Sequence, residues 1–414
     1  MKFILIVLMS IMVIYQESYP GGFQLNDNNA RAVGMGFSTT ANIDDPSAIY
    51  FNPAAIVFCK NNLEVSIGAS FIMPTGKFTG VTTLNEQKTT SLESWNFLLP
   101  NFYVAWKTPV EGLSIGAGVF TPFGLGTRWP SEWVGRYSAL ETYLQTIEIN
   151  PNVAYKFKLW EMPVSLAAGF GYTIGNVELS KKISTFSPEP LLNLKGNGNG
   201  TTFNAALFLQ PFKELKIGAS YRHNIKITYN GDVTYQNTTG LEALFVPGKG
   251  KTTLNLPNDF RIGVAYMLTE KLWLEGGFNY VGWSSYDTLI ISFDKMPGKP
   301  TVSYDSKNPR LYKNNFAVRL GAEYKLDECV FLRAGVYYDQ IPVDAQYVEP
   351  VLPEGNKIGY SIGVGYKISN LLDINLGYLF VLMSQTEVTN NPELFNGLYN
   401  STANVLSLSF NFHF

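Results

Sequence analysis

The sequence is poor in charged residues, in cysteine and in histidine. Charged residues make up 15% of its 414 positions, well below the roughly 25% that is usual for soluble domains. The net charge is -2, so a nucleic-acid partner, which would need a basic patch, is not predicted. Beyond residue 20, no apolar run approaches the roughly 18 residues of a membrane-spanning helix. This part of the chain must therefore enter any membrane as strands.

Aromatic residues and glycine are abundant instead. Phe, Tyr and Trp account for 14% of the chain, and 37 residues are glycine. The mean hydropathy is nevertheless +0.01, so apolar and polar residues must be finely interleaved. A helical membrane protein would separate them into long apolar segments.

The first 20 residues resemble a signal peptide. Lys2 supplies a positive charge, and an apolar core runs from Phe3 to Ile14, interrupted only by Ser10. This core is too short to span a bilayer and is typical of an export signal. We expect cleavage just before Gly21 or Gly22, although no Ala-x-Ala triplet precedes that boundary. No cysteine lies there to carry a lipid anchor, and the protein is predicted to be exported.

Two-residue alternation recurs along the rest of the chain. Every second residue from Ile358 to Ile368 is apolar, and the residues between them are glycine, serine or lysine. The stretch from Phe316 to Leu326 repeats the pattern. Successive side chains of a strand point to opposite faces, so one face would meet lipid and the other a lumen. Each stretch has about the 9–11 residues that a tilted strand needs to cross a bilayer.

Fourteen such segments are predicted, joined by connections that are alternately long and short. The segments lie near 62–71, 96–107, 113–121, 143–157, 163–181, 200–211, 215–235, 251–267, 272–293, 314–325, 330–339, 357–368, 371–388 and 403–414. An even strand count with long outer loops and short periplasmic turns is typical of outer-membrane barrels. The predicted fold is all-β, a 14-stranded antiparallel transmembrane β-barrel over residues 62–414 in the bacterial outer membrane, with both termini in the periplasm.

The last segment carries a further signal. Its alternate residues form one apolar face, which consists of Leu406, Leu408, Phe410, Phe412 and Phe414. A last strand ending in Phe resembles the signal that the outer-membrane barrel assembly machinery recognises. This machinery is therefore an expected partner through Phe414.

Residues 21–61 do not alternate and are predicted to form a hatch inside the barrel. A disordered tail is the alternative, but Ile49, Tyr50 and Phe51 make the segment too apolar for one. A lumen enclosed by fourteen strands is also too wide for wall side chains alone to fill. We expect Asn52-Pro53-Ala54 to fix the last turn of this plug, because proline presets its dihedral angle and asparagine hydrogen-bonds locally.

Several motifs resemble those of the FadL/TodX (OMPP1) family of outer-membrane transporters. The N-terminal motifs are Gly22-Phe23-Gln24-Leu25-Asn26, Arg31-Ala32-x-Gly34-Met35-Gly36, Asp44-Asp45-Pro46-Ser47-Ala48 and Asn52-Pro53-Ala54. Further motifs are Phe120-Thr-Pro-Phe-Gly124, Trp133-x-Gly135-Arg136-Tyr137, Leu194-Lys-Gly196, Leu254-Asn-Leu-Pro257 and the Phe414 end. Their order and spacing together are specific, and they span nearly the whole mature chain.

The resemblance implies a barrel plugged by an N-terminal hatch that imports long-chain fatty acids or aromatic hydrocarbons. The hatch residues would be Gly22, Phe23, Asn52, Pro53 and Ala54. The substrate would leave sideways into the membrane through a kink in the third strand, which maps to Thr121, Pro122, Phe123 and Gly124. Proline cannot donate to a strand ladder and glycine tolerates unusual dihedral angles. A simple loop beginning at Pro122 is the alternative.

Three cations are candidates for binding a substrate carboxylate. Arg319 and Arg333 alternate with lipid-facing neighbours and so point into the lumen. Lys313 matches a lysine in the Lys-x-x-aromatic pattern of the family. For the two arginines, charge pairing with Asp44 or Asp45 of the hatch is the alternative, because an arginine cannot shed its charge.

No catalytic, metal or cofactor site is predicted. His223 and His413 have no cysteine, histidine or carboxylate at metal-ligand spacing. Catalysis by His223 would need a serine and a carboxylate brought beside it by the fold. Cys59 and Cys329 are expected to be unpaired thiols, with a bridge across the periplasmic rim as the alternative.

Two glycine-containing stretches are expected to be loops. Gly250-Lys251-Thr252 resembles the end of a phosphate loop, but Phe245 stands where the first glycine is required. The stretch from Lys195 to Gly200 is glycine-rich but precedes a predicted strand rather than a helix. Neither is predicted to bind phosphate.

The predicted function is transport of hydrophobic small molecules by passive, hatch-gated diffusion through the barrel wall. A general diffusion porin and a structural or adhesive surface barrel are the alternatives. The plug of about forty residues favours the transporter, because a water-filled porin has no use for it. The expected partners are the hydrophobic substrate and outer-membrane lipid, and the protein is expected to be a monomer.

Overall fold

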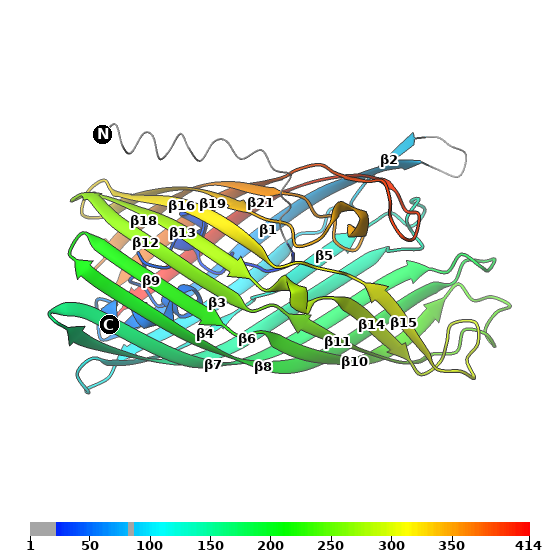
Figure 1. Ribbon diagram of the computed structural model, residues 1–414, viewed down its shortest axis with the longest axis horizontal. Coiled ribbons are helices and arrows are strands. Elements are labelled where there is room, and N and C mark those ends of the chain that lie inside the picture. The colour runs from blue at the N-terminus through cyan, green and yellow to red at the C-terminus, as the bar shows by residue number, and fades with distance from the viewer. Residues whose placement is uncertain (1–21, 82–86) are drawn as a thin grey trace.

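The computed structural model describes residues 22–81 and 87–414. The strands wrap into one elongated closed barrel whose wall is antiparallel throughout (Figure 1). The predicted signal peptide, residues 1–20, lies outside the described residues. Among the described residues no helix has the length and apolar character needed to cross a membrane.

The wall has fourteen strands, as the alternation predicts. Seven run without interruption: β1 (Leu63–Val81), β6 (Glu141–Leu159), β7 (Met162–Lys182), β8 (Leu191–Phe212), β17 (Val330–Asp339), β18 (Lys357–Ser369) and β21 (Gly397–His413). Each of the other seven consists of two pieces: β2 (Gln87–Ser91) with β3 (Phe97–Lys107), β4 (Leu113–Phe120) with β5 (Gly124–Arg128), β9 (Leu215–Arg222) with β10 (Ile225–Gln236), β11 (Gly248–Leu256) with β12 (Asp259–Thr269), β13 (Leu272–Val281) with β14 (Thr288–Phe293), β15 (Tyr304–Pro309) with β16 (Asn315–Lys325), and β19 (Leu372–Met383) with β20 (Thr386–Val388).

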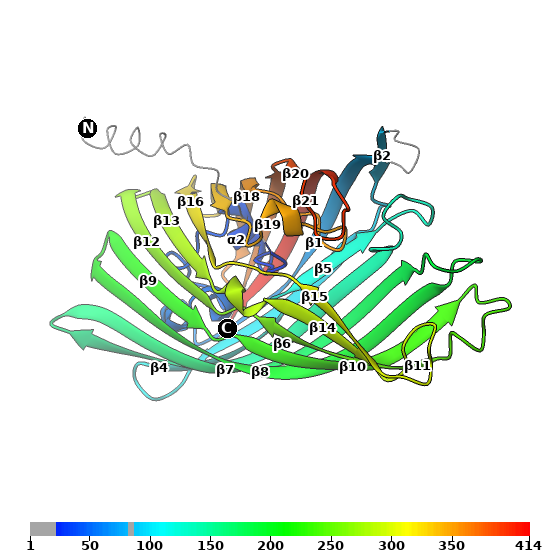
Figure 2. The ribbon, with the colours of Figure 1, turned by 45° about the vertical axis from the view of Figure 1, so that its right-hand side comes forward.

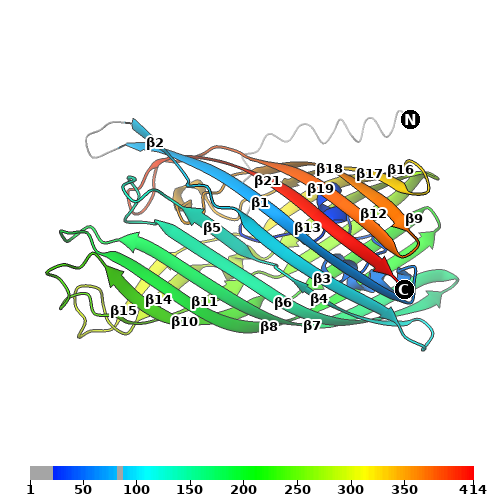
Figure 3. The same cartoon turned by 180° about the vertical axis from the view of Figure 1, so that it is seen from behind.

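The barrel closes where the first strand meets the last. β1 pairs with β21 from Glu64–His413 to Gly80–Gly397 and with β3 on its other side, as Figure 3 shows. The side chains alternate across the wall as the sequence predicts. Ile362 is 63% exposed on the lipid face, whereas its neighbour Ser361 is 5% exposed on the lumenal face.

In the outer part of the wall, the two glycine-containing stretches that were expected to be loops form strands instead. Lys195–Gly200 lies within β8 and pairs with β7 and β10, and Gly250–Thr252 lies within β11 and pairs with β10 and β14. Beyond the hydrocarbon layer a strand needs its ladder hydrogen bonds but no apolar face, so alternation does not reveal it. Close packing explains the glycine there: a Cβ at Gly198 would lie 2.3 Å from the carbonyl oxygen of Thr228.

The N-terminal segment is folded inside the ring of strands, where Figure 2 shows α2. Its short helices are α2 (Ala30–Gly34), α3 (Ala48–Phe51) and the 3-10 helix η1 (Pro53–Phe58). The Asn29 side chain caps α2 and the Asn52 side chain caps η1, each by accepting backbone N–H groups of the helix. Of two further 3-10 turns, η2 (Trp283–Ser285) lies in the interruption between β13 and β14, and η3 (Ala345–Tyr347) belongs to the connection between β17 and β18.

Candidate functional site

The wall has a break between its second and third strands. β4 pairs with β3 as far as Val119–Phe102, but β5 pairs with β6 alone. In the described chain Phe97–Asn101 of β3 pairs with β1, and no strand pairing joins it to β5. Above the break the Glu93 amide donates to the carbonyl of Arg128 at 2.8 Å, which reconnects the two strands. The break therefore lies at the interruption formed by Thr121, Pro122 and Phe123.

The start of the hatch hydrogen-bonds to this interruption. Leu25 N–H donates to the carbonyl of Pro122 at 2.9 Å, and Gly124 N–H donates to the carbonyl of Phe23 at 3.0 Å. Thr121 N–H donates to the side-chain oxygen of Asn28 at 3.2 Å. Backbone groups of this stretch, which has no ladder partner on β3, thus find partners inside the lumen, as polar groups next to lipid require. Pro122, which has no N–H, leaves no donor unpaired here.

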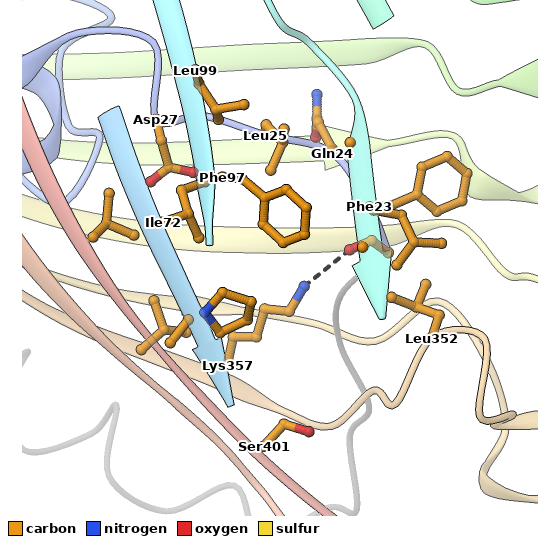
Figure 4. A pocket seen from close by; sticks show the side chains of 18 of the residues that line it. Phe23, Gln24, Leu25, Asp27, Ile72, Phe97, Leu99, Leu352, Lys357 and Ser401 are labelled. Carbon is orange, nitrogen blue, oxygen red and sulfur yellow. Dashed lines mark hydrogen bonds between the residues drawn. The ribbon is translucent and has the colours of Figure 1, made fainter. Parts of the chain in front are cut away.

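A cavity of about 460 Å³ lies beside the break. Figure 4 shows Leu25 of the hatch, Phe97 of β3 and Lys357 of β18 around it. Its lining joins the start of the hatch, the strands on either side of the break and the inner wall, and most of these residues are apolar. The volume falls within the about 300–1,000 Å³ of small-molecule pockets.

Five charged side chains also line this cavity. They are Asp27, Arg319, Asp339, Glu354 and Lys357. Lys357 Nζ lies 3.2 Å from Glu354 and donates to the carbonyl of Gly22 at 3.0 Å, while Gly22 N–H donates to Glu354 at 2.9 Å. Burial raises the pKa of Glu354 to about 7 and that of Asp27 to about 6.

A second cavity, of about 160 Å³, lies on the outer side of the first. The two cavities share Phe23, Leu125, Tyr143 and Leu144 in their linings. The Phe23 ring sits in an aromatic cluster, with its centroid 4.8 Å from that of Trp283 and 5.6 Å from that of Tyr286. Phe23 is therefore part of the partition between the two cavities.

A buried charge network ties the rest of the hatch to the wall. Arg31 lies 2.5 Å from Asp44 and 3.3 Å from Asp45, both in the hatch, and 2.9 Å from Glu323 of β16. Glu323 in turn pairs with Arg333 of β17 at 2.7 Å. Both arginines thereby gain the partner that a buried cation requires.

Two further contacts fix the middle of the hatch. The carboxylate of Glu275, on β13, accepts the backbone N–H groups of Thr40, Ala41 and Asn42 at 2.6, 3.0 and 2.7 Å. Asn52 accepts from Ala54 N–H at 3.1 Å and donates to the carbonyls of Thr40 and Leu207 at 2.8 and 3.2 Å. Asn52-Pro53-Ala54 therefore links the hatch to itself and to β8.

The three candidate cations have different environments. Lys313 has a side chain that is 65% exposed, pairs with Asp344 at 2.6 Å and does not line either cavity. Arg333 pairs with Glu323, and Arg319 lines the larger cavity. The predicted pairing of either arginine with Asp44 or Asp45 is wrong, because Arg31 of the hatch already holds both carboxylates.

The histidines and cysteines occupy sites that sequence spacing does not reveal. The His223 ring stacks on Phe203 with centroids 4.5 Å apart. His413 lies between Glu64 and Asp373 of the neighbouring strands, at 3.3 and 3.1 Å. Over residues 22–81 and 87–414, no three His, Cys, Asp or Glu side chains are grouped to hold a metal ion. Cys59 and Cys329 are both free thiols, the first buried and the second exposed.

Comparison with known proteins places the chain in a family. Residues 11–414 match the family described as outer membrane protein transport protein (OMPP1/FadL/TodX). The chain belongs to this family. It is a β-barrel of the outer membrane, as predicted.

Two curated relatives illustrate this membership. Outer membrane protein P1 of Haemophilus influenzae is 26% identical, over 87% of this chain and 85% of its own. The long-chain fatty acid transport protein of Escherichia coli O6:H1 is 24% identical, over 89% and 88% respectively.

Solved structures of the family share the fold. A FadL homologue of Pseudomonas aeruginosa superposes with a TM-score of 0.81 at 21% identity, covering 95% of this chain and all of that one. The toluene transporter TodX of Pseudomonas putida superposes with a TM-score of 0.72 at 15% identity, covering 93% and 98%.

The motifs did not reveal several residues of the site. Glu275, Glu354 and Lys357 belong to none of them, although Glu275 alternates with outward-facing neighbours on its strand. That alternation is the one signal by which an inward carboxylate could have been found. Glu354 follows the second segment after the one that carries Glu275, and only the closed barrel brings it to Gly22.

Proposed function

We propose that this protein imports hydrophobic small molecules across the outer membrane by passive diffusion, with release through the break in the barrel wall. The observation that carries the proposal is the apolar cavity of about 460 Å³ beside that break. The names of its relatives support the substrate class: one is a long-chain fatty acid transport protein and another a toluene transporter. We infer that it is a transporter and not an enzyme.

The proposed route uses both cavities in turn. A substrate would enter the outer cavity, pass the partition at Phe23 and reach the inner cavity next to β5. Leaving through the wall keeps an apolar molecule in apolar surroundings, whereas the periplasm would expose it to water. Each buried CH₂ group is worth about 0.8 kcal/mol, so this difference is large for a long chain.

The proposed gate is the start of the hatch rather than the whole of it. Residues 22–25 contact the interruption through the two backbone hydrogen bonds at Phe23 and Leu25. Residues 31–54 are held by the Arg31 network, by Glu275 and by Asn52. We propose that the first part moves, which requires it to release these two bonds and the contacts of Gly22 with Glu354 and Lys357, while the second part stays fixed. Asn52, Pro53 and Ala54 belong to the fixed part.

The filled lumen supports this proposal over a general porin or an adhesive barrel. Helices α2, α3 and η1 are buried within the ring of strands, and a water-filled porin has no use for them. Lipid on the outer face and the assembly machinery at Phe414, which is 58% exposed, are the proposed macromolecular partners. We expect the barrel to function as a monomer.

The test is to fill the space between the cavity and the break. A Cβ at Gly124 would lie 2.6 Å from the Leu25 side chain, so Gly124→Phe places a ring in the proposed route. Gly276→Phe is the matched control, because Gly276 is exposed and a Cβ there meets nothing within 4 Å. Uptake of a labelled fatty acid and of labelled toluene is measured in cells that lack other such transporters.

We expect Gly124→Phe to lower uptake at least about tenfold and Gly276→Phe to leave it near the wild-type rate. Heat-dependent mobility in gels confirms that each barrel is folded. Wild-type uptake by a folded Gly124→Phe barrel would refute the route through the wall. Uptake of a small sugar by the wild type would instead favour the porin.

A further inference from the structure

The outward face of the long strands changes from apolar to polar at their outer ends. On β7, Phe170, Tyr172 and Ile174 are 53%, 40% and 43% exposed, as side chains that meet lipid are. The next outward position on β7 is Asn176, and polar outward positions continue on β8, β10 and β11. These strands therefore extend beyond the apolar band, into the layer where the head groups of outer-leaflet lipids lie.

Asparagine recurs on this outer face. Asn176, Asn197 and Asn230 are exposed and lie opposite one another on β7, β8 and β10. Lys251 of β11 lies opposite Asn230 and completes the row. Asparagine is disfavoured in strands, where threonine is the more stable choice for a face that meets only water. A row of exposed amides, each a donor and an acceptor, suits a ligand with many hydroxyl groups.

Two lysines of the outer face have no acidic partner. In the part of the chain that the structure describes, neither Lys226 nor Lys251 forms a salt bridge, and both are exposed. By contrast, Lys249 of the next row outward pairs with Asp232 at 2.5 Å. The two unpaired cations can therefore bind anionic groups of a ligand, such as phosphate.

The two lysines lie at different heights above the apolar band. Lys226 comes three residues after His223, whose ring stacks on the lipid-facing Phe203 with centroids 4.5 Å apart. In the ladder Lys226 lies opposite Asn255, and Lys251 is four residues further out along β11, which is about 13 Å in a strand. A ligand that reaches both lysines must therefore extend outward along the wall from the head-group layer.

A hollow of about 600 Å³ lies at the upper part of this face. Asn230 and Lys251 line it together with Ser292 of β14 and Asp305 of β15, which form a hairpin beside β11 (Figure 1). Apart from Phe293, the lining consists of glycine and polar residues. The carboxylate of Asp305 would repel a bare phosphate but accepts hydrogen bonds from hydroxyl groups. The mixed lining thus fits a sugar that carries phosphate rather than phosphate alone.

We propose that the outer face of β7, β8, β10 and β11 binds a phosphorylated glycolipid of the outer leaflet. Its acyl chains lie against the apolar band, its phosphate groups contact Lys226 and Lys251, and its sugars contact the asparagine row and the hollow. Charge complementarity supports this occupant, because the unpaired cations match phosphate and the position beside the bilayer matches a lipid. The site is on the outside of the wall and is independent of the transport route through the lumen.

The test measures binding of lipopolysaccharide, the phosphorylated glycolipid of bacterial outer membranes, to the full barrel in mild detergent. Kd is obtained by native mass spectrometry for a short-chain lipopolysaccharide and for the same molecule after removal of its phosphates. The variant is Lys226→Gln/Lys251→Gln. The control is Lys77→Gln/Lys88→Gln, which removes two exposed charges at the outer ends of β1 and β2, on the opposite side of the barrel (Figure 3).

We expect the wild type and the control to bind the intact molecule at least about tenfold more tightly than the dephosphorylated one. Lys226→Gln/Lys251→Gln should raise the Kd for the intact molecule at least about tenfold and change the Kd for the dephosphorylated one less than about twofold. Heat-dependent mobility in gels confirms that each barrel is folded.

A second variant, Asn197→Thr/Asn230→Thr, separates binding from folding. Threonine fits a strand better than asparagine, so the free energy of unfolding should not decrease. The Kd for both forms of the glycolipid should rise at least about threefold, because hydrogen bonds to the sugars are lost. Unchanged binding in this variant would contradict the sugar contacts.

Three further outcomes would overturn the inference. Equal affinity of the wild type for the intact and the dephosphorylated molecule would exclude the phosphate contacts. Equal weakening by the site pair and the control pair would show that only the overall charge of the outer end matters. If the saccharide released from its acyl chains bound as tightly as the whole molecule, the occupant would be a soluble glycan and not a lipid.

Discussion

The contact between Glu275 and the hatch allows a quantitative prediction. Oε1 of Glu275 accepts from Thr40 and Ala41, and Oε2 accepts from Asn42. These three residues are at most 4% exposed. Glu275→Ala leaves three buried N–H groups without an acceptor, and each costs about 1–3 kcal/mol. Local stability of the hatch should therefore fall by at least about 3 kcal/mol.

Glu275→Gln should lower the stability of the hatch less than Glu275→Ala does, because it removes only one of the three hydrogen bonds. The amide oxygen keeps the two hydrogen bonds of Oε1, but the NH₂ group faces the N–H of Asn42. One donor is then unpaired, and the expected loss is about 1–3 kcal/mol. Glu270→Gln is the control, because Glu270 is exposed in the turn before the same strand.

Hydrogen exchange measured by mass spectrometry on peptides covering residues 38–44 reports this loss directly. Since about 1.4 kcal/mol corresponds to tenfold, exchange should be about fivefold to about a hundredfold faster in Glu275→Gln and at least about a hundredfold faster in Glu275→Ala. Peptides from β1 and β21 should keep their protection. Unchanged protection of residues 38–44 in a folded Glu275→Ala barrel would show that the hatch does not depend on this carboxylate.

Two more predictions follow from single residues. Cys59 is buried, which raises the pKa of its thiol, whereas Cys329 is exposed in a short turn. A maleimide should therefore label Cys329 of the folded protein and leave Cys59 unmodified. In cells, a maleimide that cannot cross membranes should reach Cys329 only after the outer membrane is opened. Because burial raises the pKa of Glu354 from 4.5 to about 7, the folded state binds more protons than the unfolded state between these values. The free energy of unfolding should thus decrease from pH 5 to pH 8, and Glu354→Gln should reduce that decrease; an equal decrease in the variant would assign the pH dependence to other groups.

The strands inside the membrane could be predicted because lipid imposes a simple rule on them. Outward residues such as Ile362 and Val318 must be apolar, and their neighbours need not be. Above the membrane this rule no longer applies, so alternation does not predict the start of β8 at Leu191, and its glycine-rich part has the composition of a loop. Backbone hydrogen bonds hold Asn197 opposite Asn230 and Asn176. Such bonds do not require alternating apolar and polar residues, so the sequence pattern does not reveal them.

The site could be predicted only in outline. Proline and glycine at positions 122 and 124 indicate an irregular third strand, but the sequence does not show that Phe23 and Leu25 supply its missing partners. The alternation of apolar and polar residues does predict that the side chains of Arg319 and Arg333 point into the lumen. Which carboxylate meets which arginine depends on the register of the wall and the path of the hatch, both of which are long-range properties. The pairing of Arg333 with Glu323 is therefore visible only in the folded barrel.

The burial of the Arg31 network determines how the attachment of the hatch responds to ionic strength. Arg31, Asp45, Glu323 and Arg333 have side chains that are at most 10% exposed, and mobile ions screen buried pairs far less than exposed ones. The exposed pair between Lys313 and Asp344 weakens as salt rises, whereas the attachment of the hatch weakens far less. A barrel whose outer surface meets dilute water at one time and brine at another thus keeps its plug seated in both.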